Sequence, residues 1–322
     1  MATLTLRELF RRYVSDGRYL PDGSLKTDAY LDHVEKTGQN LCRFFGESFL
    51  VPGFTLYGMA GYVRARRAGK ITANEVRTNC IKQELRILKA ALNWACGVHE
   101  EGRLLLDRNP IDKLKIPHEK DPRRPVIDGD TSDALLAVAD QVHPFLPLLI
   151  TLARTTGRRL SSILGLRWDD FDFSNGTIRW RAELDKRRKS WVTPIPSRTL
   201  IVLQQYRAAH PSIGATLVFP HPRRKRMRGN PVTRHLAAYW LKRAYDLAKV
   251  AKPHGSLWHV FRRVWATERK HLPPRDVAAA GGWSDIGTLL SVYQQPDEET
   301  MRQVVDYEKP RLPRWKSRLA PR

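Results

Sequence analysis

The sequence has few of the residues that stabilise small secreted proteins, and it lacks a segment that could cross a membrane. Three of its 322 residues are cysteines, and Cys42, Cys80 and Cys96 lie far apart without a CxxC pair. Neither a disulfide framework nor a zinc site is therefore predicted. No apolar run approaches the ~18 residues of a membrane span, and arginines stand where a signal peptide needs an apolar stretch. We expect a soluble protein of the reduced cytoplasm.

Acidic residues are also scarce. There are 33 Asp and Glu against 56 Lys and Arg, which gives a formal net charge of +23. Solubility does not require so large a charge, whereas binding to a polyanion favours it, and nucleic acid is the commonest polyanion. A basic surface that is merely solvated is the alternative that charge alone leaves open. No cluster of carboxylates or of His and Cys is visible, so neither a metal nor another cofactor is expected.

Residues 1–116 have the apolar periodicity of α-helices. Capping-box patterns at Thr5–Glu8 and Thr72–Glu75 predict the starts of two helices. The periodic segments predict four helices in this part of the chain, over about 6–15, 30–45, 56–68 and 72–98. This part of the chain is therefore predicted to be a helical domain.

A linker and a second domain are predicted to follow. Residues 117–126 are polar, contain prolines and have no periodicity, which is typical of a linker, and the second domain then covers 127–322. In that domain Asn175-Gly176 is a strong hairpin signal. The alternation of apolar residues beyond it predicts a small three-stranded antiparallel sheet, whose last strand at 191–195 lies at an edge because it contains proline. Helical patterns dominate the rest, so the predicted fold class is α+β, mainly α with one small sheet.

Basic side chains gather on two predicted helices of the first domain and on two polar loops of the second. The loops are a hairpin tip at 185–189 and the segment 221–229. We expect contacts with DNA phosphates from Arg64, Arg66, Lys82, Arg86, Lys89, Arg187, Arg188 and Arg224. For any one of the helix residues a solvated face is an equally good interpretation.

Two arginines are the candidates for binding the reacting phosphate, because a guanidinium presents a planar fork to the phosphate oxygens. They are Arg159, which ends the motif Thr156-Gly157-Arg158-Arg159, and Arg262. His259 precedes Arg262 by one helical turn, so both lie on one face, where the imidazole could donate to a phosphate oxygen or transfer a proton. These residues predict the cleavage of a phosphodiester without a metal.

Three further residues complete this predicted site. Trp283 has an indole N–H that can bond to phosphate but cannot shuttle protons. Lys186, at the tip of the predicted hairpin, could reach the leaving 5′ oxygen as a general acid. Tyr293, in the helix after Trp283, would be the nucleophile and form a phosphotyrosyl intermediate. A lone tyrosine is usually a core or surface residue, so the prediction depends on the order and spacing of the whole set.

In this order and spacing the second domain resembles the catalytic domain of tyrosine recombinases, the phage integrase family. The matching residues are 156–170, Lys186, His259-Val260-Phe261-Arg262, Gly282-Trp283-Ser284 and Tyr293. The resemblance implies that six residues are catalytic, namely Arg159, Lys186, His259, Arg262, Trp283 and Tyr293. It also implies that residues 1–116 are the helical, SAM-like core-binding domain and that both domains form a C-shaped clamp on double-stranded DNA. A homotetramer would then synapse two recombination sites in the nucleoid and exchange strands through 3′-phosphotyrosyl links.

Three positions depart from the family pattern. Ser162 stands where an acidic residue usually braces the active site, which puts the support of Arg159 in question. Trp283 replaces the commoner histidine. Residues 278–281 are Ala-Ala-Ala-Gly where bulkier apolar residues are usual, which predicts looser packing beside the nucleophile.

Two other functions are compatible with the same residues. A type IB topoisomerase would use this chemistry on a single duplex, and a DNA-binding regulator that has lost catalysis would keep the charge. The tail after Tyr293 is mostly polar but contains Val304, Val305 and Tyr307. In this family such a tail often docks on a neighbouring protomer, and docking on its own protomer is the alternative.

Overall fold

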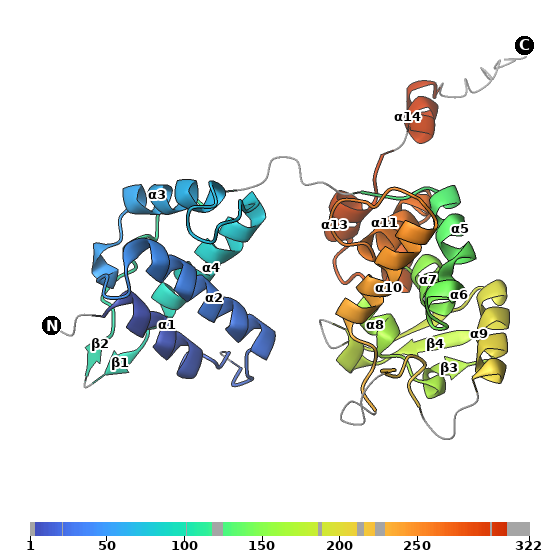
Figure 1. Ribbon diagram of the computed structural model, residues 1–322, viewed down its shortest axis with the longest axis horizontal. Coiled ribbons are helices and arrows are strands. Elements are labelled where there is room, and N and C mark those ends of the chain that lie inside the picture. The colour runs from blue at the N-terminus through green and yellow to red at the C-terminus, as the bar shows by residue number, and fades with distance from the viewer. Residues whose placement is uncertain are drawn as a thin grey trace, which may run out of the picture. The chain divides into compact units, whose positions relative to one another are not determined.

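The computed structural model describes residues 4–20, 22–100, 102–117, 125–185, 189–210, 216–222, 229–296 and 298–307. The chain separates into two compact units, Met1–Pro122 and Arg123–Arg322, and each is taken by itself below (Figure 1). The boundary between the units falls inside the segment 117–126 that the sequence indicates as a linker.

The N-terminal unit is helical. Its helices are α1 (Leu6–Ser15), α2 (Asp28–Phe45), α3 (Leu56–Arg67) and α4 (Thr78–Ala95), and a hairpin of β1 (His99–Glu100) and β2 (Arg103–Leu104) follows them. The side chains of Thr5, Thr27 and Thr55 each accept a hydrogen bond from a backbone N–H in the first turn of α1, α2 and α3. Such caps satisfy donors that have no partner within the helix. The apolar faces of α1, α2 and α4 then pack together, around fully buried Leu9, Leu41 and Leu88.

The fourth helix starts later than the capping-box pattern predicts. It begins at Thr78, and its N-cap, Arg77, makes no side-chain cap hydrogen bond. The Thr72 hydroxyl accepts a hydrogen bond from Nη1 of Arg66 at 2.6 Å. The predicted start at Thr72 is therefore wrong, because a side chain from α3 uses the hydroxyl that was expected to cap α4.

A buried ionic network explains why Arg66 turns inward. Its side chain is 6% exposed, and Nε and Nη2 donate to the Glu84 carboxylate at 3.0 and 2.8 Å. Tyr62 and Asn40 donate to the same carboxylate, at 2.8 and 3.0 Å. A guanidinium that is buried and paired is not available to a phosphate, because breaking a buried pair leaves an uncompensated charge. The prediction that Arg66 contacts DNA is therefore wrong.

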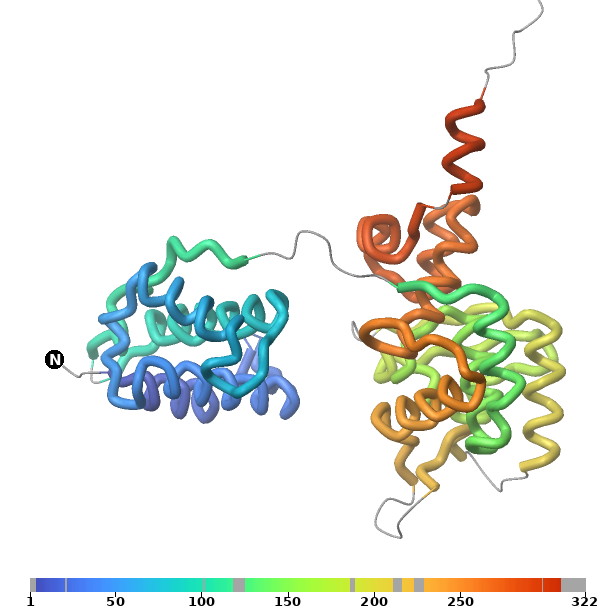
Figure 2. Tube along the Cα trace, turned by 45° about the horizontal axis from the view of Figure 1, so that its top comes forward, coloured from blue at the N-terminus to red at the C-terminus, as the bar shows by residue number. Residues whose placement is uncertain are grey.

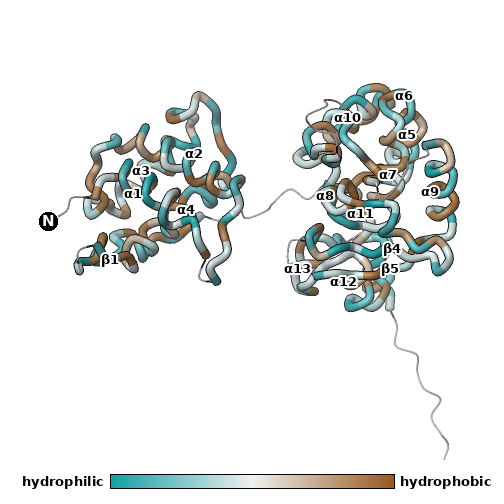
Figure 3. The backbone as a smooth tube through the Cα atoms, turned by 90° about the horizontal axis from the view of Figure 1, so that it is seen from below, coloured by the Kyte–Doolittle hydropathy of each residue, from teal (hydrophilic) through white to brown (hydrophobic). Residues whose placement is uncertain are grey.

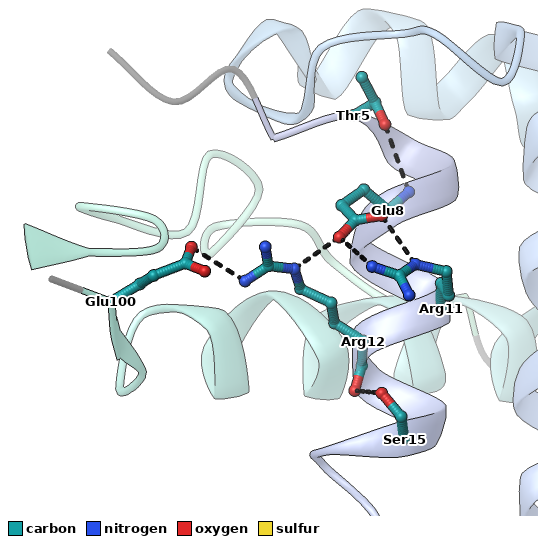
Figure 4. A network of polar contacts seen from close by, with 6 residues as sticks. All are labelled: Thr5, Glu8, Arg11, Arg12, Ser15 and Glu100. Carbon is teal, nitrogen blue, oxygen red and sulfur yellow. Dashed lines mark hydrogen bonds and ion pairs between the residues drawn. The ribbon is translucent and has the colours of Figure 1, made fainter.

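A second polar network joins α1 to the β1–β2 hairpin (Figure 4). Glu8 accepts hydrogen bonds from Arg11 at 2.9 and 2.7 Å and from Arg12 at 2.6 Å. Arg12 also donates to Glu100 at 3.0 Å. The hydrogen bonds from Arg11 and then Arg12 lower the pKa of Glu8 to about 2, so its carboxylate stays charged at neutral pH. The network lies at the surface, where ion pairs contribute little stability.

The C-terminal unit is mainly helical and contains one small sheet. Its strands β3 (Phe171–Asp172), β4 (Thr177–Trp180) and β5 (Trp191–Pro194) are antiparallel in the order β3-β4-β5, so the predicted sheet and its edge strand are confirmed. The helices are α5 (Gly129–Ala137), α6 (Ala139–Val142), α7 (Leu146–Thr156), α8 (Leu160–Leu164), α9 (Ser197–Ala209), α10 (Arg234–Leu247), α11 (His259–Glu268), α12 (Pro274–Gly281), α13 (Ile286–Thr288) and α14 (Glu298–Val305). The predicted α+β class is confirmed.

The core of this unit surrounds α7, which packs against α9, α10 and α11 and buries Leu149, Ile150 and Leu152 completely. Hydrophilic and hydrophobic stretches alternate along its helices (Figure 3). Neither α9 nor α14 is among the helices predicted from the sequence. Helix α9 buries only Thr199 and Leu203 and has a weak apolar period. In α14 the apolar residues Met301, Val304 and Val305 do recur at helical spacing, but they lie in a short segment that otherwise reads as a polar tail. Among the described residues, no helix combines the length and apolarity that crossing a membrane requires.

Candidate active site

A glycine at the end of α7 turns the chain so that Arg159 enters a cleft. Gly157 has φ +60°, and a Cβ at this position would lie 2.4 Å from the ring of Trp265. Both the left-handed conformation and the close approach require glycine. Arg159 follows as the N-cap of α8 in an extended conformation and is partly exposed. The motif Thr156-Gly157-Arg158-Arg159 is thus a turn whose shape depends on Gly157.

Helix α11 carries Arg262 into the interior of the unit. This side chain is 1% exposed, and its Nη1 donates to the carbonyl oxygens of Gly157 and Gly281 at 2.5 and 2.6 Å. Burial, followed by the positive charge of Arg159, lowers the pKa of Arg262 to about 9. The guanidinium therefore remains charged at neutral pH. Its two other nitrogens, Nε and Nη2, have no hydrogen-bond partner in the described part of the chain.

The indole of Trp283 lies against this guanidinium. Gly282, with φ +72°, ends α12 and places Trp283, whose ring centroid is 3.5 Å from Cζ of Arg262. Trp265 stacks on the same indole at 5.9 Å. Nε1 of Trp283 is buried and also lacks a partner among the described residues. A buried donor without a partner costs about 1–3 kcal/mol. An anion bound beside these two side chains would give all three donors a partner.

Tyr293 lies at the end of a π-helical turn, Leu289–Tyr293, and is 7% exposed. Its ring meets that of Trp283 edge to face at 4.9 Å, and its Oη is 2.9 Å from Nε2 of His259. The Thr267 hydroxyl donates to the Tyr293 carbonyl oxygen at 3.1 Å, which fixes the end of the turn on α11. Single π turns are frequent at functional sites. The turn brings the phenol to a histidine that lies 34 residues earlier in the sequence.

The environment of His259 keeps its imidazole neutral. Burial, and then the positive charges of Arg263 and of the two site arginines, lowers the pKa of His259 to about 4. At neutral pH one ring nitrogen can therefore accept a proton, and we assign that role to Nε2, which faces the phenol of Tyr293. Of the two roles that the sequence leaves open, this contact favours proton transfer over donation to a phosphate.

Arg159, His259 and Arg262 line a cleft of about 900 Å³. Arg234 and Lys242 of α10 line the same cleft. Sequence reasoning missed these two cations. A signal was available, because residues eight apart lie on nearly the same face of a helix and both precede the His259–Arg262 pair. The cleft is therefore more basic than the motif residues alone indicate.

The other predicted phosphate contacts divide into three groups. Arg64 and Arg86 are exposed on the N-terminal unit, and Lys82 is half-buried. Lys89 donates to the carbonyl oxygen of Asp112 at 2.6 Å. Arg187, Arg188 and Arg224, and also Lys186, the predicted general acid, lie outside the described residues.

Ser162 and the small residues of α12 both have a clear packing role. The Ser162 hydroxyl donates to the carbonyl oxygen of Leu184 at 2.8 Å and so attaches α8 to the turn after β4. A Cβ at Gly281 would lie 1.9 Å from the Trp283 ring and 2.8 Å from that of Trp265. The predicted looser packing beside the nucleophile is therefore wrong, because two indoles fill the space that small side chains leave.

Known proteins share this sequence pattern. Residues 125–300 match the phage integrase family, which is more than half of the chain. The chain is 26% identical over 262 residues to the tyrosine recombinase XerC of Xylella fastidiosa, which covers 78% of this chain and 82% of that protein. It is 24% identical over 304 residues to a tyrosine recombinase of Thermosipho africanus, with 91% and 95% covered.

Solved structures share the fold. One is the Tn1549 transposon integrase in complex with circular intermediate DNA, with a TM-score of 0.70, 18% identity and coverage of 94% of this chain and 100% of that chain. Another is a lambda integrase tetramer bound to a Holliday junction, with a TM-score of 0.70, 15% identity and coverage of 92% and 80%. The chain belongs to the phage integrase family. Its enzyme class is that of the tyrosine-type site-specific recombinases.

Proposed function

We propose that the protein cleaves and rejoins double-stranded DNA at a recombination site through a 3′-phosphotyrosyl link to Tyr293. The observation that carries this proposal is the contact of 2.9 Å between Oη of Tyr293 and Nε2 of His259, beside a buried guanidinium with two unpartnered nitrogens. A phenol needs a base to become a good nucleophile, and a neutral imidazole within hydrogen-bond reach supplies one.

The reaction has two proton transfers and one exchange of bonds at phosphorus. Tyr293 Oη attacks the phosphorus and gives its proton to Nε2 of His259, while the bond from phosphorus to the 5′ oxygen breaks. The leaving 5′ oxygen takes a proton from a general acid, for which Lys186 is the candidate from the sequence. Attack by that 5′ hydroxyl, or by one from a second duplex, reverses the steps and releases the tyrosine.

Charge on the phosphate is stabilised by side chains in this proposal. Arg159 in the cleft, Nε and Nη2 of Arg262, and the indole N–H of Trp283 would bind the non-bridging oxygens. Donors that are already in place when charge develops usually contribute the largest part of such catalysis. These groups supply the positive charge that a metal supplies in many other phosphoryl-transfer enzymes, so the proposed reaction needs no cofactor.

The proposed DNA contacts involve both units. Exposed Arg64 and Arg86, with Lys82, Lys89, Arg187, Arg188 and Arg224, would bind phosphates of the duplex. A charge of +23 favours such a role. The enzyme would then act on the nucleoid in the cytoplasm.

Recombination between two sites also requires several protomers, and α14 suits a contact between them. Its apolar side chains are uncovered: Met301 is 50%, Val304 76% and Val305 81% exposed. Helix α14 projects from the body of its unit (Figure 2). We propose that it docks on a neighbouring protomer of a homotetramer. This feature favours a recombinase over a type IB topoisomerase, which acts without a partner copy.

A nicked suicide substrate tests the proposed chemistry. The wild-type protein should form a covalent adduct in the presence of EDTA, and Tyr293→Phe should bind DNA without forming one. Tyr245→Phe is the matched control, since Tyr245 is a buried tyrosine of α10 outside the site, and it should form the adduct. Resolution of a Holliday junction then separates a recombinase from a topoisomerase. An adduct that maps to another tyrosine, or one that needs Mg²⁺, would contradict the proposal.

A further inference from the structure

The C-terminal end of α12 is held by Arg158, the neighbour of the predicted catalytic arginine. Nε of Arg158 donates to the carbonyl oxygen of Ala280 at 3.1 Å, and Nη2 donates to that of Ala279 at 3.2 Å. The last carbonyl groups of a helix lack partners within it and carry partial negative charge, so a guanidinium there is stabilising. The next residues after this helix end are Gly282 and Trp283, so whatever fixes the helix end also fixes the indole.

Arg158 also contacts the sheet. Its Cζ lies 4.9 Å from the ring centroid of Trp180 in β4 and 5.7 Å from that of Trp191 in β5, and α12 lies beside β5 (Figure 3). A Cβ at Gly282 would lie 2.1 Å from Nη1, so glycine is needed for this approach. Arg158 is 5% exposed, and burial lowers its pKa to about 10, which leaves it charged at neutral pH. It therefore joins the edge of the sheet to the end of α12.

We propose that Arg158 is a positioning residue for DNA cleavage, which holds the end of α12 against the sheet and thereby keeps the indole N–H of Trp283 directed at the phosphate. This inference rests on the proposed function. We assign Arg158 a positioning role because its Nε and Nη2 both donate to backbone carbonyl oxygens of α12. Arg262 has an additional anchor at Gly157, so its orientation depends less on α12 than that of Trp283 does.

Two adjacent arginines thus have different tasks. Both residues line the cleft, but the guanidinium of Arg158 lies between two indoles and a helix end, where it donates to backbone carbonyl oxygens. A side chain that only stabilises the fold would change how much protein is active. One that positions Trp283 changes the rate constant of each active molecule.

The full-length Arg158→Lys variant tests this distinction. Lysine keeps the charge but cannot span both carbonyls from one planar group. The assay is single-turnover cleavage of a nicked suicide substrate at saturating protein. We expect the rate constant to fall about 10- to 100-fold, which is no more than the fall caused by removing one hydrogen-bond donor to the transition state. The fraction of substrate cleaved and the affinity for DNA should stay unchanged.

A double-mutant cycle shows whether the effect passes through Trp283. Trp283→Phe keeps an aromatic ring and removes the N–H, so adding Arg158→Lys to it should lower the rate constant less than about 3-fold, because nothing is left to position. Arg154→Lys is the matched control on the preceding helix, where Arg154 pairs with exposed Asp133, and it should cleave at the wild-type rate.

Each outcome decides the proposal. A wild-type rate constant in Arg158→Lys, with or without a smaller amplitude, would reduce Arg158 to a structural residue. Equal losses in the wild-type and Trp283→Phe backgrounds would disprove the coupling. If the lysine variant does not fold, Arg158→Gln, which keeps one donor, is measured by the same two criteria. A wild-type protein that forms no adduct would instead contradict the proposed function.

Discussion

The partly buried imidazole of His259 makes a quantitative prediction about stability and pH. Its pKa is lowered to about 4 from an unfolded value of 6.5, so between these values the unfolded chain binds a proton that the native protein excludes. Stability contributed by the neutral imidazole is therefore present above pH 6.5 and is lost as the pH falls towards 4. The shift in pKa corresponds to about 3 kcal/mol of the free energy of unfolding, of which about 2 kcal/mol is lost by pH 5.

Urea unfolding at pH 7 and pH 5 measures this loss of stability. Between these pH values the free energy of unfolding should fall by about 2 kcal/mol more in the wild-type protein than in His259→Gln, whose side chain cannot be protonated. His254→Gln, which removes an exposed histidine, should behave as the wild type. An NMR titration of the imidazole gives the pKa directly. A midpoint near 6.5, or the same pH dependence in wild type and His259→Gln, would refute the argument from burial.

The same pKa predicts the pH dependence of cleavage. If neutral His259 accepts the proton of Tyr293, the rate constant for adduct formation should stay level as the pH falls to about 5.5 and decline only towards pH 4. A decline centred near pH 6.5 would show that the active imidazole is solvated in the DNA complex. Across the whole pH range, His259→Gln should cleave more slowly than the wild type, typically by a factor of 10² or more.

Three other results follow from the charges and exposed surfaces. Arg262→Lys keeps a charge but loses the fork that binds Gly157, Gly281 and the phosphate, so single-turnover cleavage should fall roughly 10²- to 10³-fold, and a loss under about 3-fold would contradict the phosphate role. For ~6–10 phosphate contacts, the affinity for DNA should fall about 10³-fold or more between low and moderate salt, and a flat titration by fluorescence anisotropy would contradict the clamp. Truncation after Gln295 should leave DNA binding intact and weaken synapsis in a native gel, whereas unchanged synapsis would show that α14 does not join protomers.

Sequence alone determined the features that have local causes. The threonine cap of α1, the Asn175-Gly176 hairpin and most helices follow from propensity and period over a few residues. The order of Arg159, His259, Arg262, Trp283 and Tyr293 was sufficient for the resemblance to the family. The fold places Tyr293 in contact with His259, Arg262 and Trp283, and Arg159 lines the same cleft as His259 and Arg262.

Tertiary structure decided the matters in which residues far apart compete for one partner. Arg66 was expected at DNA, but Glu84 of the next helix binds it in the interior and Thr72 is drawn into the same network. The small residues of α12 suggested loose packing, yet the indole of Trp265 from the preceding helix and that of nearby Trp283 fill the space. Of two adjacent arginines, Arg158 binds the end of α12, a partner that is more than a hundred residues away in the sequence. Local pattern specifies what a side chain can do, and its partner in space, which no local pattern encodes, determines what it does.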